Sequence, residues 1–280
     1  MGRKPCGRPA KRTDHLSQMP RLSSFLALAF LLSAPRWIAA RFLDATPILP
    51  IRLPLSALQF VSVLLAVIIA TRSGRGSVPA LLARGLDLAR VDKPVWRVGI
   101  FVLMPLAVAA SYALSTLFGD PHPTDTTPLV SVPALLLIYG VSGYCEQLGW
   151  TAVMTDALLE QGSATVQVGL ITGTTWASWH IIPFIQTHNP PSWIAWQCTF
   201  TVIYRVLLTK IYLLTNYSVF TTIALHATYN TAFTLLPYYG SSYDPMSMAI
   251  TTLALTVSVF VTTGRKMGGA PARTGESCAT

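Results

Sequence analysis

Residues 131–153 read SVPALLLIYGVSGYCEQLGWTAV, and this stretch decides the class of protein. An α-helix rises about 1.5 Å per residue, so a helix of this length crosses a hydrocarbon core of about 30 Å. Its one charged residue is Glu146, and it holds no Lys or Arg. An ionisable side chain at membrane depth is costly and usually marks a functional site or pathway. The stretch therefore predicts a transmembrane helix that carries a functional carboxyl group.

The composition of the whole chain agrees with a polytopic membrane protein. Of 280 residues, 52% are hydrophobic and only 11% are charged, whereas about a quarter of the residues of a soluble domain are charged. The net charge of +9 does not indicate nucleic-acid binding, because the basic residues gather in the N-terminal tail, in the 72–97 loop and near the C-terminus. Cytoplasmic loops of membrane proteins show this distribution.

We expect an all-α protein with about eight transmembrane helices in one domain over 22–263, between a basic tail at 1–21 and a flexible tail at 264–280. The apolar run 22–34 follows basic residues as in a signal peptide, but Arg36 and Arg41 come directly after it, which favours a retained first span. The eight hydrophobic segments are 22–43, 53–71, 97–118, 131–153, 166–187, 192–214, 217–237 and 246–263.

Eight crossings put both termini on one side of the membrane, and the basic residues predict that this side is the cytoplasm. The 72–97 loop then lies inside, and the acidic loops of Asp120, Asp125 and Asp244 lie outside. Within the inner loop, residues 78–92 predict a short amphipathic helix on the membrane surface. We expect a multi-pass protein of the cell membrane.

Several other polar or aromatic residues have structural interpretations. Arg205 and Lys210, at the inner end of the sixth segment, are interpreted as anchors whose charges reach the membrane surface. The cysteines show no metal-ligand spacing and predict no disulfide framework. Tryptophans inside or beside the spans are expected to pack or to lie at the interface; they are Trp150, Trp176, Trp179, Trp193 and Trp196.

Two histidines, His180 and His226, share with Glu146 a position inside an apolar segment. From Arg97 to Arg205 there is no Lys or Arg, so the histidines are the natural partners of Glu146. Helical rise puts Glu146 about 23 Å from the outer end of its span, and His180 and His226 about 21 Å and 14 Å from the inner ends of theirs. These depths let the three side chains meet if their helices are neighbours.

The surroundings of these residues support one polar site. His226 and Asn230 are four residues apart and share a helix face. Trp176 stands one turn before His180, and Gly149 would let another backbone or a substrate approach Glu146 closely. Pro183 is expected to break or kink the fifth span.

These residue types suit the hydrolysis of a peptide bond without a covalent intermediate. A carboxylate in a desolvated site can take a proton from water and later return it, and a histidine can share that proton or orient the water. A second histidine beside an asparagine supplies donors for the oxyanion of a tetrahedral intermediate.

Three motifs resemble those of the CPBP family, the CAAX-protease and bacteriocin-processing intramembrane proteases. They are Glu146-Gln147-Leu148-Gly149-Trp150-Thr151, then Trp176 with Trp179-His180, then His226 with Asn230. The resemblance covers about 130–235, the expected catalytic core. It implies an eight-helix membrane hydrolase in which Glu146 activates water with help from His180. His226 and Asn230 would then bind the oxyanion.

The family has been described both as metalloendopeptidases and as glutamate proteases, which leaves a metal as an alternative. Glu146, His180 and His226 could in principle bind zinc. Because they are dispersed over three helices with no local ligand spacing, we favour a site without metal or other cofactor.

Two departures from the family pattern define an alternative function. The second motif glutamate is Gln147, and the motif arginine is Thr151. A catalytically inactive membrane scaffold or immunity-type protein is therefore an alternative to an endopeptidase that cleaves a membrane-associated peptide or protein. A transporter with a Glu/His proton relay ranks last, because the chain shows no paired broken helices and no similarity between its halves.

Overall fold

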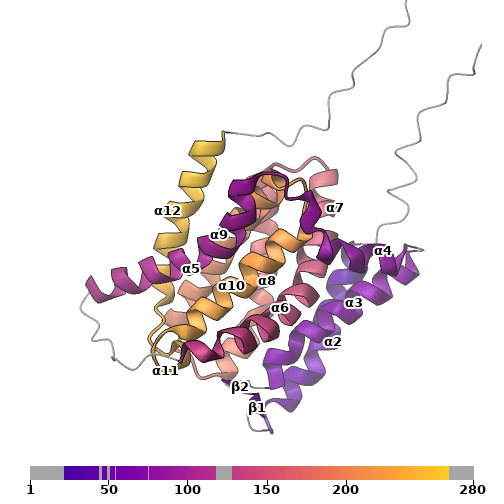
Figure 1. Cartoon of the computed structure of the whole chain (residues 1–280). Coiled ribbons are helices and arrows are strands. Elements are labelled where there is room, and N and C mark those ends of the chain that lie inside the picture. Colours follow the sequence, from indigo (N-terminus) through magenta and orange to yellow (C-terminus); the bar gives the residue numbers. More distant parts are fainter. Residues whose placement is uncertain are drawn as a thin grey trace, which may run out of the picture.

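The computed structural model describes residues 22–43, 46–48, 51–53, 55–74, 76–117 and 128–264. These residues are almost entirely helical (Figure 1). The exception to the all-α prediction is an antiparallel pair of short strands, β1 (Thr46–Ile48) and β2 (Ile51–Leu53). The basic tail 1–21, the loop of Asp120 and Asp125, and the tail beyond Gly264 lie outside the described residues.

Long helices occupy all eight of the predicted hydrophobic segments. They are α2 (Leu22–Ala39), α3 (Phe60–Ser73), α5 (Pro94–Leu117), α6 (Val132–Gly149), α8 (Thr165–Gln186), α9 (Pro191–Leu214), α10 (Val219–Leu235) and α12 (Pro245–Thr263). Five helical stretches in the described part of the chain are long and apolar enough to cross a membrane, namely Leu22–Ala39, Leu55–Ser73, Pro94–Leu117, Leu129–Glu160 and Pro245–Thr263. The protein is thus a multi-pass membrane protein, and its more polar helices α8, α9 and α10 carry much of the site described below.

Short elements connect or extend the long helices. They are η1 (Leu55–Gln59), α4 (Val78–Ala83), η2 (Arg84–Leu86), η3 (Leu88–Arg90), η4 (Leu129–Ser131), the π-helical η5 (Trp150–Thr155), α7 (Asp156–Glu160) and α11 (Pro237–Gly240). Side-chain caps define where two of the long helices begin. Ser218 accepts the N–H of Thr221 at the start of α10, and Asp244 accepts those of Met246 and Ser247 before α12.

Two prolines lie inside continuous helices, so the break that was one of the two expectations for Pro183 does not occur. The helix α2 continues through Pro35 to Ala39, and α8 continues through Pro183 to Gln186. A proline inside a helix removes one backbone hydrogen bond, and packing against neighbouring helices can tolerate that loss in a membrane bundle. His180 therefore stands in a continuous helix.

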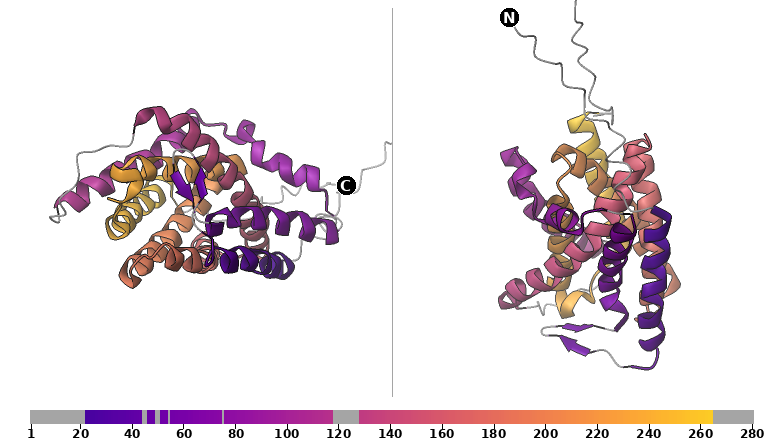
Figure 2. Two further views of the ribbon diagram at one scale, coloured as in Figure 1. Left: turned by 90° about the horizontal axis from the view of Figure 1, so that it is seen from below. Right: turned by 90° about the vertical axis from the view of Figure 1, so that its right-hand side faces the viewer.

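The long helices pack as a closed ring (Figure 2). Following neighbours around it, α2 packs on α3, α3 on α6, α6 on α10, α10 on α5, α5 on α12, α12 on α9, α9 on α8, and α8 returns to α2. A contact of α10 with α9 crosses the ring. Of the helices that bear Glu146, His180 and His226, α6 packs directly on α10, and α8 contacts η5, which continues α6.

Aromatic packing behind α6 confirms the structural interpretation of two tryptophans. The ring of Trp150 lies 5.5 Å from that of Phe25 and 5.6 Å from that of Trp179, both edge to face. The indole of Trp179 donates to the hydroxyl of Ser33 at 3.0 Å. A Cβ on Gly149 would lie 2.5 Å from Val63 Cγ1, so its close approach serves helix packing.

Close packing of α8 on α9 depends on two glycines one turn apart. A Cβ on Gly169 would lie 2.6 Å from the Cα of Val206, and one on Gly173 would lie 2.8 Å from the Cα of Val202. Because these contacts are with backbone, no rotamer change can relieve them. The pair is a small-x-x-x-small helix contact of the kind found in membrane bundles.

We expect Gly173→Leu to destabilise the protein by about 3 kcal/mol or more, because α8 and α9 must separate to admit the side chain. The measurement is the midpoint of thermal unfolding of the detergent-solubilised protein. Gly140→Leu is the matched control, since a Cβ at Gly140 meets nothing within 4 Å. Equal midpoints for the two variants would contradict the close contact of α8 with α9.

The loop predicted to form one amphipathic surface helix instead forms the short helices α4, η2 and η3, which are held against the bundle. We call residues 82–90 the basic strap. Gly85 packs under the ring of Tyr144, whose hydroxyl donates to the carbonyl of Leu82 at 2.8 Å. Tertiary contacts to α6 therefore override the local amphipathic pattern.

Two charged residues fix the basic strap to the helices of the site. Arg84 donates to Asp156, just after η5, and to the hydroxyl of Tyr212, which itself donates to Asp156 at 2.6 Å. Asp87 accepts the N–H of Phe220 at 3.1 Å and the hydroxyl of Ser218 at 2.8 Å. The second set satisfies free N–H groups at the start of α10.

Candidate active site

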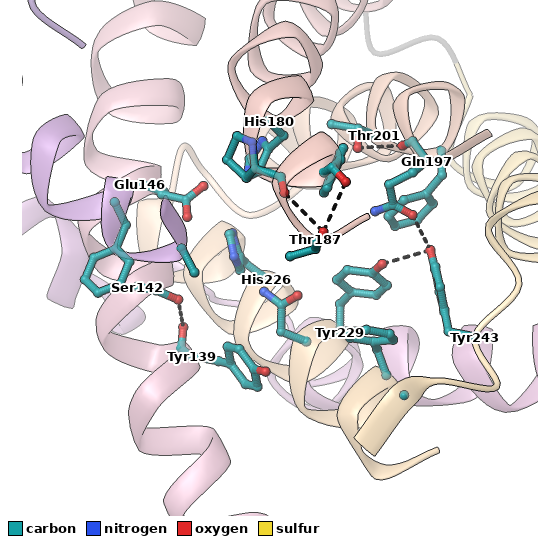
Figure 3. Close-up of a pocket in the computed structure, with 18 of the residues that line it drawn as sticks. Tyr139, Ser142, Glu146, His180, Thr187, Gln197, Thr201, His226, Tyr229 and Tyr243 are labelled. Carbon is teal, nitrogen blue, oxygen red and sulfur yellow. Dashed lines mark hydrogen bonds between the residues drawn. The ribbon is translucent and has the colours of Figure 1, made fainter. Parts of the chain in front are cut away.

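A pocket of about 540 Å³ lies between α6, α8, α9 and α10 and extends to η1 and α11 (Figure 3). All four residues predicted for the site line it: Glu146, His180, His226 and Asn230. Figure 3 shows the side chains of Glu146, His180 and His226 around one side of this space. The structure therefore brings the predicted residues together.

Glu146 lies one turn before the end of α6, where the chain passes into η5. Its side chain is only 6% exposed, and one carboxylate oxygen accepts the indole N–H of Trp176 at 2.9 Å. The sequence indicates a packing or interfacial role for Trp176, and it does pack, but its polar atom also holds the carboxylate. The second carboxylate oxygen carries no bond to another described residue and is the one available for chemistry.

His180 has one ring nitrogen committed. Its Nδ1 lies 2.9 Å from the carbonyl oxygen of Trp176. A carbonyl can only accept, so Nδ1 carries the proton and Nε2 of the neutral ring is an acceptor. The ring is stacked on that of Phe184 at 5.6 Å between centroids. His180 can therefore accept a hydrogen bond from a water in the pocket.

His226 has the opposite arrangement. Its Nδ1 lies 3.0 Å from the amide nitrogen of Gln147. An amide NH₂ group can only donate, so Nδ1 accepts and the ring proton is on Nε2. His226 is 4% exposed, and Asn230 stands one turn further along α10 with a second donor. One histidine thus offers an acceptor and the other a donor.

Arg205 corrects two expectations from the sequence. It is not an anchor at the membrane surface, because it is only 1% exposed and lies 4.5 Å over the ring of Trp176. It donates to the side-chain oxygen of Gln147 at 3.0 Å and to the hydroxyl of Thr151 at 3.1 Å. Nor is Glu146 far from every cation, because Arg205 lies over the same indole whose N–H holds the carboxylate. Lys210 is also buried and donates to the carbonyl of Gly264.

A periodic signal in α9 could have revealed this arginine. Polar residues recur every fourth position and so share one face of the helix; they are Gln197, Thr201, Arg205 and Thr209. All four are buried. A polar stripe in an otherwise apolar helix indicates a face turned toward the interior of the bundle.

The part of the pocket furthest from Glu146 is aromatic with a short polar chain. The hydroxyl of Tyr229 donates to that of Tyr243 at 2.9 Å, which donates to the side-chain oxygen of Gln197 at 2.8 Å. The surrounding walls are rings of Phe184, Trp193, Phe200 and Phe233. No Lys or Arg is among the described residues that line the pocket.

The alternative of a zinc site can be tested against the donor groups. Among the described residues, no three His, Cys, Asp or Glu side chains are grouped so that they could hold one metal ion. Nε2 of His180 is free to bind a metal, but Nδ1 of His226 accepts from Gln147 and its Nε2 carries the ring proton, so His226 offers no ligand atom. The geometry of Glu146, His180 and His226 does not fit a three-ligand site.

Comparison with known families matches a segment that carries much of the pocket lining. Residues 128–232 match the family described as Type II CAAX prenyl endopeptidase Rce1-like. Comparison with curated proteins finds no match. The matched segment contains the three motifs and all four predicted site residues. Residues 128–232 are thus similar to the CAAX-protease family of membrane proteins, and this similarity supports the resemblance that the motifs indicated.

Proposed function

We propose that this protein is an intramembrane endopeptidase in which Glu146 and His180 activate a water molecule. The observation that carries the proposal is the pocket in which a carboxylate, an accepting imidazole nitrogen and a donating imidazole nitrogen meet. The match to a family of prenyl endopeptidases supports a proteolytic function. We propose no resident metal or cofactor.

In the proposed reaction, each polar side chain of the site has a defined role. A water donates one hydrogen bond to the free oxygen of Glu146 and one to Nε2 of His180. Glu146 takes a proton as the water oxygen attacks the peptide carbonyl, and the oxyanion that forms accepts from Nε2–H of His226 and the amide of Asn230. Glu146 then gives its proton to the departing amine, and the C–N bond breaks.

The pocket suggests an apolar, membrane-associated peptide or protein as substrate. Aromatic walls suit an apolar side chain or lipid group, and the lack of a cation among the described lining residues offers no partner for a free carboxylate near the reacting bond. The family description makes a prenylated peptide the first candidate. The lipid bilayer is the second proposed partner. We do not propose that the protein binds nucleic acid.

We further propose eight crossings with both termini in the cytoplasm, in the cell membrane. The pocket extends to Thr187, Asn189 and Ser241, at the end of the bundle that carries α11 and the strand pair (Figure 1). The basic strap lies at the opposite end. With the basic loops inside, substrate therefore approaches the site from the non-cytoplasmic leaflet.

The test is hydrolysis in water enriched in ¹⁸O by the full chain in lipid vesicles. A farnesylated peptide with a C-terminal Cys-a-a-X sequence and the same peptide without the farnesyl group are the substrates. We expect a new C-terminus that carries ¹⁸O, detected by mass spectrometry. If neither peptide nor a random peptide library yields a labelled product, the proposed endopeptidase function is wrong. The alternative of an inactive scaffold is then favoured.

A chelator distinguishes the metal-free mechanism from the zinc alternative. We expect 1,10-phenanthroline or EDTA to leave the cleavage rate unchanged, because Glu146, His180 and His226 do not form a ligand set. The measurement is the initial rate before and after dialysis against chelator. A loss of rate that added Zn²⁺ restores would overturn the metal-free mechanism.

A further inference from the structure

We propose that Arg205 is a positioning residue which, through Gln147, holds His226 in the tautomer that donates from Nε2. This inference rests on the proposed function and assigns a role to a residue outside the three motifs. Arg205 comes from α9, and the motif residues come from α6, η5, α8 and α10. The guanidinium does not line the pocket, so any effect on the reaction is through its neighbours.

The first step is the orientation of the Gln147 amide. A side-chain amide can present its oxygen or its nitrogen to a given neighbour, and its hydrogen-bond partners decide which. A guanidinium only donates, so the atom of Gln147 that lies 3.0 Å from Arg205 must be the oxygen. The hydroxyl of Thr151 donates to the same oxygen at 2.8 Å.

The second step follows from the first. With its oxygen turned to Arg205, Gln147 turns its NH₂ group to His226 at 3.0 Å. Nδ1 of His226 must then accept, and the single ring proton of the neutral imidazole is on Nε2. Without Arg205, a rotated amide would present its oxygen to His226 and favour the proton on Nδ1. The oxyanion donor would then be lost.

The two departures from the family motif belong to the same arrangement. Thr151 stands at the position of the motif arginine, and the cation reaches its hydroxyl from α9 at 3.1 Å. A carboxylate at position 147 has no hydrogen to donate, so it would require a proton on Nδ1 of His226. Gln147, Thr151 and Arg205 are therefore mutually consistent, and the missing arginine does not by itself imply an inactive protein.

Arg205 also contacts the other half of the site. Its guanidinium lies over Trp176, whose indole N–H holds one oxygen of Glu146. The guanidinium of Arg205 thus contacts both Trp176, which holds Glu146, and Gln147, which holds His226.

Packing alone is a poor explanation for Arg205. Its Nε and one terminal nitrogen are buried without a hydrogen-bond partner among the described residues. A buried, partly satisfied charge does not stabilise a fold compared with an apolar residue of similar size. The arrangement therefore favours a role in the site over a role in stability.

The direct test is ¹⁵N NMR of histidine-labelled full-length protein in lipid bilayers. The signal of His226 is assigned by its loss in the His226→Gln variant. In the wild type, we expect this signal to show the Nε2–H tautomer. Arg205→Met, which keeps length and removes every donor, should shift His226 to Nδ1–H or to a mixture. Lys210→Met is the matched control, because Lys210 is a buried cation on the same helix that bonds elsewhere.

Kinetics supply a second readout. We expect Arg205→Met to lower kcat about 10²-fold, as loss of an oxyanion donor does, with KM within about twofold of the wild type. Arg205→Lys retains a donor and should keep most of the activity and the tautomer. Thr151→Arg added to Arg205→Met should restore both, since position 151 is one turn from Gln147 on the same face of α6 and η5.

The outcomes separate the two proposals. A wild-type protein that cleaves peptide, with an Arg205→Met variant unchanged in tautomer and kcat, overturns the role of Arg205 alone. If the protein does not cleave peptide but the tautomer of His226 still depends on Arg205, the proposed function is overturned. The role of Arg205 in orienting Gln147 and His226 is then retained. If Arg205→Met does not fold, Gln147→Glu takes its place, because a carboxylate there must move the His226 proton to Nδ1; an unmoved proton overturns the inference.

Discussion

Glu146→Gln should lower kcat for peptide cleavage by about 10²–10⁴, the contribution that a positioned general base makes to such reactions. The amide has nearly the shape of the carboxylate, and its oxygen can still accept the indole N–H of Trp176. It cannot take a proton from water. We therefore expect a folded protein that binds substrate with an unchanged KM and scarcely turns it over.

The control for this variant is Glu160→Gln, which makes the same chemical change at an exposed position at the end of α7. Thermal unfolding of both variants in detergent should match that of the wild type within about 3 °C, the shift that a ΔΔG of about 1 kcal/mol produces in a protein of this size. Full activity of Glu146→Gln would exclude Glu146 as the base.

His226→Ala is expected to lower kcat about 10²–10³-fold, the usual effect of removing one oxyanion donor. The reason is the fixed Nε2–H, which Gln147 enforces by occupying Nδ1. His226→Gln should lose less, because the terminal amide nitrogen of glutamine lies near the position of imidazole Nε2. Steady-state kinetics of both variants on the same peptide make the comparison.

The contrast between these two variants separates a chemical role from a structural one. A structural role for His226, which packs 5.6 Å from the ring of Trp176, would make both substitutions lower the unfolding midpoint and reduce activity alike. Equal losses of kcat in His226→Ala and His226→Gln, each with a lowered midpoint, would thus contradict the assignment of an oxyanion donor.

The sequence predicts the helices well because their signal is local. A run of about twenty apolar residues is sufficient to identify each segment, and the long helices lie in all eight predicted segments. The order of helices around the ring is not local information. Which helix packs on which depends on shape, as where Gly169 and Gly173 admit the backbone of α9, and a hydropathy pattern does not contain it.

The acid and the histidines are easier to find from the sequence than Arg205, whose inward position is indicated only by the polar stripe of α9. Glu146, His180 and His226 stand alone in apolar surroundings and belong to recognisable motifs. Arg205 lies five residues from Lys210 toward the end of its segment, where basic residues usually reach the membrane surface. The structure identifies the inward partners of its charge as Gln147 on α6 and Thr151 on η5.

The tautomers of His180 and His226 could not be predicted from the sequence, because they depend on hydrogen-bond partners that the fold supplies. The proton of His180 is placed by a backbone carbonyl one turn earlier, and that of His226 by a side chain from another helix. The amphipathic pattern of 78–92 was misleading because it reports polarity along the chain and omits contacts such as that of Gly85 with Tyr144.

The basic strap determines where this protein can accept a label. Because Arg84 and Asp87 join the chain after Glu146 to the first turn of the helix bearing His226, an epitope or fluorophore inserted there would disturb chemistry deep in the bundle. Ser77, a few residues earlier, is exposed and makes only a local cap. A reporter placed beside Ser77 should leave turnover intact, whereas the same reporter beside Asp87 should not.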